Sequence, residues 1–488
     1  MQRRWKVLML VSVGVFMVSL DLFIVNIAFP KIEADFGGAD VSSVSWVLNA
    51  YAIVVAALMV SAGRLADRHG RKRAFLLGLG VFVAGSALCG AAPSLGGLVA
   101  ARVVQAVGAT LLLPISLALL LPEFEPSERP AAIGIWAAVG GLAAAAGPPL
   151  GGLLVQVSWR LVFLVNIPVG LIALAYGLRL LRESRDESQA RPDLLGSALI
   201  VLGIGVLSLG LVKAPEWGWG SARTIAAFAL ATAGLAGFWA RCLTNVAPVV
   251  DPAMLRVRSF AAANLASVLF SAAFAAFLLA NVLFMTSVWQ RSTLIAGLSL
   301  APGPALAAVC AATSARHINR FGQRTLAVLG IALFGLGCLW WRLRMGPTPD
   351  YLGEMLPGLL ITGVGVGLVL PSLASAASSS LPPARFATGS AVFTMTRQVG
   401  FVLGVSILVA VLGTPDRADA LAAFERGWAF MIFTSALGLL AALAIGKIRT
   451  ADAPVDGARG RTSPTREPQL DGLEVRPQPG RRVGAARS

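Results

Sequence analysis

The stretch GRLADRHGRKR, residues 63–73, lies between two long apolar blocks of the chain. A shift of 252 residues, which brings Gly70 to Gly322, places ARHINRFGQRT, residues 315–325, on it. The shift pairs Arg64 with Arg316, Asp67 with Asn319, Arg68 with Arg320 and Lys72 with Arg324. It also places the first apolar block on the ninth and the fourth on the twelfth. The chain therefore contains two related halves in parallel order, an arrangement found in many membrane transporters.

The composition places the chain among membrane proteins. Of its 488 residues, 57% are hydrophobic and 13% are charged. A soluble globular chain is about 45–50% apolar and about 25% charged. Many apolar blocks approach the roughly 20 residues with which a helix crosses a hydrocarbon core. We therefore expect an all-α polytopic membrane protein. Its two histidines and four cysteines have no metal-ligand spacing, so we expect no metal site.

Hydropathy predicts fourteen membrane spans. They cover approximately residues 7–29, 44–62, 74–92, 96–121, 131–156, 160–181, 194–213, 222–244, 259–288, 293–315, 325–345, 352–376, 386–412 and 427–447. The basic start (Arg3, Arg4 and Lys6) predicts a cytoplasmic N-terminus, and fourteen crossings return the C-terminus to the same side. Most lysines and arginines then fall in inner loops, although Arg342 and Arg344 do not.

The predicted spans divide the chain into four parts. These are an N-terminal six-helix bundle (1–185), a linker with two additional helices (186–250), a C-terminal six-helix bundle (251–449) and a cytoplasmic tail (450–488). The tail is rich in Pro, Gly, Arg and Ser and lacks apolar periodicity, so we expect it to be disordered. Basic inner loops account for the net charge of +16, so no nucleic-acid partner is expected. The prevalence of arginine over lysine suggests a GC-rich bacterium, and hence a bacterial cytoplasmic membrane.

Residues 63–73 resemble the signature loop Gly-x-Leu-x-Asp-Arg-x-Gly-Arg-Lys/Arg of the major facilitator superfamily, and the chain resembles its fourteen-helix drug:proton antiporter branch over about residues 5–448. The resemblance implies two six-helix bundles with two extra central helices. It also implies a cytoplasmic gating loop that clamps the halves when the cavity opens outward. The loop residues concerned are Gly63, Arg64, Asp67, Arg68, Gly70 and Arg71. Gly63 allows close helix approach and Gly70 a positive φ. The alternative, an ordinary basic loop on the inner side, would explain the arginines but not Gly63, Asp67 and Gly70 at these positions.

Two charged residues stand inside predicted spans of the first half. The stretch MVSLDLFIVNIAFP, residues 17–30, carries Asp21 and resembles the first span of the same branch. LVAARVVQAVGA, residues 98–109, carries Arg102 and resembles the superfamily motif associated with proton coupling. A carboxylate among apolar side chains can exchange a proton near neutral pH. We expect Asp21 and Arg102 to lie at similar depth and to form the proton-coupling pair. Snorkelling of Arg102 to the outer interface is the alternative.

The fifth span contains GGLAAAAGPPLGG, residues 140–152. Its small residues allow another helix to pack closely, and its prolines favour a kink. The stretch resembles the Gly-Pro-x-x-Gly-Gly antiporter motif, here Gly147, Pro148, Gly151 and Gly152, which implies export rather than import. Residues 158–170, SWRLVFLVNIPVG, resemble another stretch of the fourteen-helix branch and contain Asn166.

Five residues are candidates for lining a central cavity: Asn26, Gln105, Asn166, Phe274 and Arg397. Phe274 repeats with Phe270 and Phe277 at helical spacing, and the alternative for this stripe is helix packing or lipid contact. Arg397 either faces the cavity or binds a free carbonyl group. Apart from the edge residue Glu354, the second half has no embedded acid of the kind that accompanies dication export in relatives. We therefore expect a lipophilic substrate that is neutral or monocationic.

These observations predict proton-coupled export of small amphipathic compounds, including drugs, by alternating access. We expect a monomer in the lipid bilayer whose energy comes from the proton gradient, without a cofactor. A dedicated exporter of one endogenous metabolite or antibiotic is the first alternative. An importer is disfavoured by the motif at 147–152. A membrane-embedded enzyme would need a polar catalytic cluster or an extramembrane domain, and neither is evident. The chain has no Gly-x-x-x-x-Gly-Lys-Ser/Thr sequence for binding phosphate, so we do not expect ATP-driven transport.

Overall fold

The computed structural model describes residues 2–37, 39–125, 128–186, 191–382, 385–413 and 419–446. These residues form helices joined by short connections, and they contain no strand. Residues 1–448 form one compact unit. The predicted disordered tail lies outside the described residues. Fourteen helices of the described chain are long and apolar enough to cross a membrane, which confirms the number of spans predicted from hydropathy.

The first half contains six of these spans. Its helices are α1 (Arg3–Asp35), α2 (Val41–Val44), α3 (Trp46–His69), α4 (Arg71–Gly90), α5 (Leu95–Leu120), α6 (Arg129–Val157), α7 (Leu161–Leu164) and α8 (Asn166–Leu180), with a 3-10 turn at Leu121–Glu123. Two further spans follow, α9 (Leu194–Trp217) and α10 (Ala222–Thr244). Several helices are longer than the apolar stretches from which they were predicted. For example, α1 continues past the predicted end at residue 29 and includes Pro30.

The second half contains the other six spans. Its helices are α11 (Pro252–Leu255), α12 (Arg258–Leu283), α13 (Thr293–Leu300), α14 (Pro302–Phe321), α15 (Gln323–Arg344), α16 (Leu356–Ser379), α17 (Phe386–Leu412) and α18 (Ala420–Leu443). π-Helical turns at Phe284–Val288 and Tyr351–Met355 extend α12 and precede α16.

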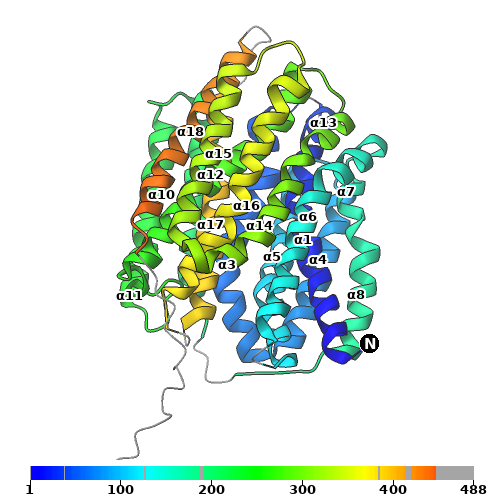
Figure 1. Ribbon diagram of the computed structural model, residues 1–488, viewed down its shortest axis with the longest axis vertical. Helices are drawn as coiled ribbons and strands as arrows, with labels where there is room; N and C mark the ends of the chain where they lie inside the picture. The colour runs from blue at the N-terminus through cyan, green and yellow to red at the C-terminus, as the bar shows by residue number, and fades with distance from the viewer. Residues whose placement is uncertain are drawn as a thin grey trace, which may run out of the picture. The chain divides into compact units, whose positions relative to one another are not determined.

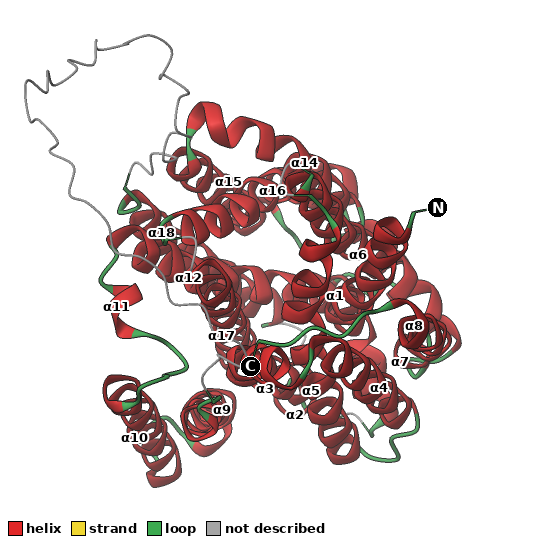
Figure 2. Ribbon diagram, turned by 90° about the horizontal axis from the view of Figure 1, so that it is seen from below, coloured by secondary structure: helices red, strands yellow, loops and turns green. Residues whose placement is uncertain are grey.

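The two halves repeat one packing pattern (Figures 1 and 2). In the first half α1 packs on α6, and both α3 and α4 pack on α5. In the second half α12 packs on α17, and both α14 and α15 pack on α16. The contacts between the halves follow the same symmetry, because α3 lies against α17 and α6 lies against α13 and α14. The sequence repeat is thus a structural repeat.

The two additional helices lie beside the seam between the halves. α9 packs on both α3 and α17, while α10 packs on α9, outside it in Figure 2. The hydroxyl groups of Ser61 on α3 and Ser197 on α9 lie 2.8 Å apart. Farther along α9, the hydroxyls of Ser208 and Ser406, the latter on α17, lie 2.7 Å apart. The inserted pair therefore contacts both halves through α9.

Matching glycines turn the chain between α3 and α4 and between α14 and α15. Gly70 has φ 120° and Gly322 has φ 82°, a region that favours glycine, which confirms the turn predicted at Gly70. A Cβ at Gly70 would lie 2.7 Å from the Glu183 carboxylate. That carboxylate accepts hydrogen bonds from the Lys72 and Arg73 amides, 3.0 and 3.2 Å long, and so caps the start of α4. We call this end of the bundle, which also carries the N-terminus, the Gly70 end, and the opposite end the α13 end (Figure 1).

Candidate functional site

Asp21 lies in the middle of α1 with no exposed surface. Its two carboxylate oxygens accept hydrogen bonds from two residues of α5. Arg102 donates from Nη1 over 2.5 Å, and Gln105 donates from Nε2 over 2.8 Å. Arg102 is also completely buried, so the alternative that it snorkels to the interface is wrong. The structure therefore joins the acid and the arginine that the sequence placed at similar depth.

Arg102 is held by several further contacts. Its Nη1 also donates to Gln105 Oε1 over 2.6 Å, and its Nε donates to the Val47 carbonyl over 3.0 Å. The guanidinium lies over the Tyr51 ring, with 4.1 Å from Cζ to the ring centroid, a cation–π contact. Its Nη2 has no hydrogen-bond partner among the described residues. The positive charge is thus fixed by a carboxylate, a side-chain amide, a carbonyl and an aromatic face.

Gln105 extends this cluster to α4. Its Nε2 donates to the Ser86 hydroxyl over 2.9 Å as well as to Asp21. Glycines bring the two helices this close. A Cβ at Gly85 would lie 2.6 Å from Gln105 Cα, and one at Gly108 would lie 2.4 Å from the Phe82 amide nitrogen. We call Asp21, Tyr51, Ser86, Arg102 and Gln105 the Asp21 cluster; it joins α1, α3, α4 and α5.

Proton binding to Asp21 would disrupt the whole cluster. A buried ion pair that loses one charge leaves the other uncompensated, at a cost of about 3–5 kcal/mol when a partner is removed. Protonated Asp21 no longer balances Arg102, so the arginine must find other acceptors or the helices must rearrange. Because α1, α3, α4 and α5 all contribute, a change at one carboxyl group affects the packing of four helices. This geometry can couple protonation to conformation.

The residues of the predicted gating loop bind to the segments that flank the inserted helices. Arg64 donates to the carbonyl groups of Ala247 and Pro248, both over 2.9 Å. Asp67 pairs with Arg71 at 2.7 Å. The backbone amides of Arg71 and Asp186 bind the carbonyls of Ser184 and Asp67 respectively. In this conformation the loop is therefore tied to residues 183–186 and 247–248. Arg68 is half-buried.

Glycine at position 63 is not required by packing. A Cβ there would lie 3.9 Å from Pro114 Cβ, an ordinary contact distance, and no other described residue approaches it more closely. The close approach expected at Gly63 is therefore wrong. In this part of the first half, the close helix contacts that require glycine lie between α4 and α5, at Gly85 and Gly108.

The motif at residues 147–152 forms a close contact on two sides of α6. Toward α1, a Cβ at Gly147 would lie 2.6 Å from Phe23 Cβ, and one at Gly151 would lie 3.0 Å from Ile24 Cγ1. Toward the second half, a Cβ at Gly152 would lie 3.1 Å from Leu294 Cα, and one at Gly297 of α13 would lie 2.3 Å from the Pro148 carbonyl oxygen. The small-residue surface predicted from the sequence is thus confirmed. It joins the two halves at the α13 end.

A small cavity of about 20 Å³ lies between the halves. Residues of α1, α3, α12 and α17 line it: Leu22, Asn26, Leu48, Asn49, Ala52, Ala275, Leu278, Phe401 and Val405. Its volume is comparable with the space that holds one water molecule. Among the predicted cavity residues, Asn26 lies here.

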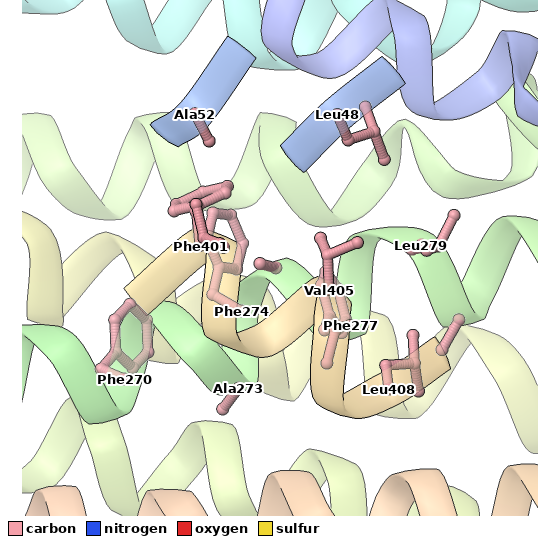
Figure 3. Packing of buried hydrophobic residues seen from close by; sticks show 14 of the residues in the cluster. Leu48, Ala52, Phe270, Ala273, Phe274, Phe277, Leu279, Phe401, Val405 and Leu408 are labelled. Atoms are coloured by element: carbon pink, nitrogen blue, oxygen red, sulfur yellow. The ribbon is translucent and has the colours of Figure 1, made fainter. Parts of the chain in front are cut away.

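The other predicted cavity residues lie elsewhere. Gln105 belongs to the Asp21 cluster, and Asn166 is buried at the start of α8. Phe274 is 7% exposed and lies between the rings of Phe270 and Phe277, in agreement with the packing alternative. Figure 3 shows Phe401 on the side of α17 that faces Leu48 and Ala52. Its ring lies edge to face with that of Phe274, with 5.9 Å between the centroids. Arg397 precedes Phe401 on α17.

The signals for Tyr51, Ser86 and Phe401 are weak in the sequence alone. Each is a common residue in an apolar span, and only the rotation of its helix decides whether it faces the seam, the lipid or a neighbour. Residues four apart from a known site residue share a helix face, so Arg397 could have indicated Phe401. Nothing comparable indicated Tyr51 or Ser86.

Comparisons with known proteins agree with this architecture. Residues 11–405 match the family model described as Major Facilitator Superfamily. The tetracenomycin C resistance and export protein of Streptomyces glaucescens is 34% identical over 414 residues, covering 84% of this chain and 76% of the relative. The cephamycin export protein CmcT of Amycolatopsis lactamdurans is 33% identical over 413 residues, covering 83% and 85%. The multidrug resistance protein Stp of Mycobacterium tuberculosis is 33% identical over 405 residues, covering 82% and 74%.

Solved structures share the fold at low sequence identity. A peptide transporter, POT, in complex with sulfate superimposes with a TM-score of 0.64 at 18% identity over 91% of this chain and 95% of its own. A mutant of the nucleoside transporter NupG gives a TM-score of 0.64 at 12% identity over 91% and 100%. The fourteen helices, the structural repeat and the family match lead to one conclusion. This chain is a multi-pass membrane transporter that belongs to the major facilitator superfamily.

Proposed function

We propose that this protein exports small amphipathic compounds across a bacterial cytoplasmic membrane in exchange for protons. The Asp21 cluster carries the proposal, because it supplies a buried carboxylate whose charge is tied to four helices. Asp21 carries the proton and Arg102 opposes its charge. The relatives include resistance and export proteins for antibiotics, which supports export as the direction.

Alternating access follows from rocking of residues 1–185 against residues 251–449. In the described conformation the α13 end is held closed by the contact between Pro148 and Gly297 and by the 3.2 Å hydrogen bond from Asn49 to Ser406. The first turns of α17 at the Gly70 end present an exposed Ser390. We assign the Gly70 end and both termini to the cytoplasm, so the end that is closed in this conformation is the outer one. The loop at residues 63–73 closes the Gly70 end when the α13 end opens.

The cycle uses the ion pair as its proton switch. With the α13 end closed, Asp21 is ionised and paired with Arg102. After the transporter opens outward, a proton from outside binds Asp21 as the substrate leaves. Neutral Asp21 no longer holds Arg102, so the transporter returns to the conformation with the α13 end closed, where Asp21 releases its proton inward and the ion pair forms again. One monomer contains all these parts.

Everted membrane vesicles test this function. An acidic interior should drive uptake of a lipophilic fluorescent dye that the wild type removes from efflux-deficient cells. Asp21→Asn should abolish the proton-driven part, because the amide cannot exchange a proton. Asp35→Asn is the matched control: this acid lies on the same helix with its carboxylate 45% exposed, and its loss should leave uptake intact. Normal proton-driven uptake by Asp21→Asn would overturn the proposal.

A dedicated exporter of one endogenous compound is the second candidate. Relatives named for the export of single antibiotics favour it. Sensitivity of an efflux-deficient host to a broad antibiotic panel separates the two. Protection against many unrelated compounds supports a drug exporter, whereas protection confined to one compound class supports the dedicated exporter.

A further inference from the structure

Arg397 is a membrane-embedded cation without a partner in the described chain. It lies within α17 and is half-buried. Its Nε is buried and has no hydrogen-bond partner among the described residues. A charge in a membrane helix is costly unless it faces a partner or a wet cavity. The missing partner therefore requires an explanation.

The helices around α17 offer no acid to Arg397 within the described part of the chain. α12 and α16, which pack on α17, carry neither Asp nor Glu. On α3 the acid is Asp67, which pairs with Arg71, and on α9 it is Glu216, which pairs with Lys213. On α18 the acid is Glu425, which is exposed. Among the described residues, each acid nearby is thus already paired or faces outward.

Arg397 shares a helix face with the residues that line the cavity between the halves. Residues 390, 394, 397, 401 and 405 repeat at spacings of three and four, which places them on one side of a helix. Phe401 and Val405 line the cavity. Arg397 is one turn nearer the Gly70 end, about 6 Å along the axis. Thr394 is half-buried and Ser390 is exposed, so this face leads from the Gly70 end to the arginine.

A second unpartnered polar atom belongs to the next residue of α17. The Oε1 atom of Gln398 is buried without a hydrogen-bond partner in the described structure. Two unsatisfied buried polar groups at consecutive positions are uncommon in a folded protein, where such groups nearly always find a partner. Both groups are therefore available to a molecule that enters between the halves.

The cavity one turn farther along α17 is apolar and aromatic. Leu22, Leu48 and Phe401 line it, and Figure 3 shows Leu48 and Ala52 opposite the Phe401 ring. We propose that Arg397 binds the acidic group of the exported compound, a carboxylate or an ionised phenol or enol, while an aromatic or aliphatic body lies against Phe401. The arginine then donates charge-assisted hydrogen bonds, which are stronger than neutral ones.

This inference rests on the proposed export function and specifies its substrate class. The sequence-based expectation of a neutral or monocationic compound rested on the lack of an embedded acid in the second half, and it did not consider the charge of Arg397. In the structure Asp21 is neutralised by Arg102. The unpartnered charge on the face of α17 that leads to the cavity is therefore positive.

Equilibrium dialysis of the purified full-length protein in detergent tests the inference. The probes are naphthalene, anthracene and anthraquinone carboxylates, each with its neutral carboxamide. Wild type should bind the acids at least roughly tenfold more tightly than the amides, as expected for a hydrogen bond to a charged group. Arg397→Gln should remove this preference, and Arg397→Lys should keep part of it. Arg385→Gln, at an exposed arginine just before α17, is the control and should retain it.

Two outcomes overturn the inference: absence of acid preference in the wild type, or an unchanged preference in Arg397→Gln. Arg397→Lys preserves the positive charge. If Arg397→Gln does not fold, a reduced preference for acids in Arg397→Lys still tests the role of Arg397. Export of the neutral dye in vesicles is measured in parallel. If that export persists while the acid preference is absent, the acid site is excluded and the proposed export function stands.

Discussion

Arg102 and Arg397 are both arginines inside membrane-spanning helices, and their environments differ completely. Arg102 is fully buried and is held by Asp21, Gln105, a backbone carbonyl and an aromatic ring. Arg397 is half-buried, and its Nε has no hydrogen-bond partner among the described residues. The first half of the transporter thus contains a cation whose partner is internal, whereas in our proposal the cation of the second half takes its partner from the substrate.

The structural repeat shows how this difference arose. The shift of 252 residues that superimposes the loops places Asp21 on Ala273, Ser86 on Cys338 and Cys89 on Trp341. Where the first half has its polar cluster, the second half has aromatic packing, with the Phe277 and Trp341 rings stacked 5.5 Å apart. One bundle, in our proposal, is specialised for a proton. The other, in our account, is specialised for the substrate.

Removal of each arginine side chain should give the largest contrast. Arg102→Met leaves Asp21 buried and unpaired, so we expect a loss of about 3–5 kcal/mol of stability. Arg397→Met removes an uncompensated charge and should leave stability unchanged or raise it. Thermal unfolding of both variants in detergent, followed by circular dichroism, measures the difference. Equal melting temperatures for the two variants would show that the cluster does not hold Arg102 as described.

A double substitution in the Asp21 cluster sharpens the same contrast. Asp21→Asn with Arg102→Met removes both charges, and replacement of a whole buried ion pair is often neutral for stability. We expect the double variant to melt within about 1 kcal/mol of wild type, well above Arg102→Met. Its proton coupling should remain absent. If the double variant is as unstable as the sum of both single variants, the two residues do not interact.

The sequence predicted the fourteen spans and the pairing of Asp21 with Arg102, because length, apolar content and depth along a helix can be read directly. It did not predict Gln105 as the bridge, and it left Phe274 open between packing and the cavity, because the rotation of each helix about its axis depends on its neighbours. The packing of α9 on α3 and α17 could not be predicted either, because the order of the spans along the chain does not determine which helices the two inserted ones contact. Arg397 was recognised as deeply placed, but its lack of a partner in the described chain required the surrounding helices.

Substitution at Gly297 should weaken the closed α13 end. A Cβ there would lie 2.3 Å from the Pro148 carbonyl oxygen, so Gly297→Ala must separate α13 from α6, at a cost of about 1–3 kcal/mol. Gly134→Ala on α6 is the control, because no described residue lies within 4 Å of a Cβ at that position. We expect slower dye export and a lower melting temperature only for Gly297→Ala. Equal behaviour of the two variants would contradict the assigned closure.

The smallest expected effect concerns α9. Ser208→Ala removes the hydrogen bond to Ser406 and should cost about 0.5–1.5 kcal/mol. The control is Ser378→Ala, whose hydroxyl binds the Ala374 carbonyl of its own helix. The melting temperature should fall more for Ser208→Ala. If it does not, the contact between α9 and α17 contributes nothing measurable.

Proton movement in proteoliposomes tests most directly the central claim that Asp21 of the first half carries the proton and Arg397 of the second half binds the substrate. A pH-sensitive dye inside the vesicles reports proton flux when a gradient of a neutral exported dye is imposed. Wild type and Arg397→Gln should both move protons, because the substrate used carries no acid. Asp21→Asn should move none. Proton flux at the wild-type rate in Asp21→Asn, or its loss in Arg397→Gln, would contradict the account.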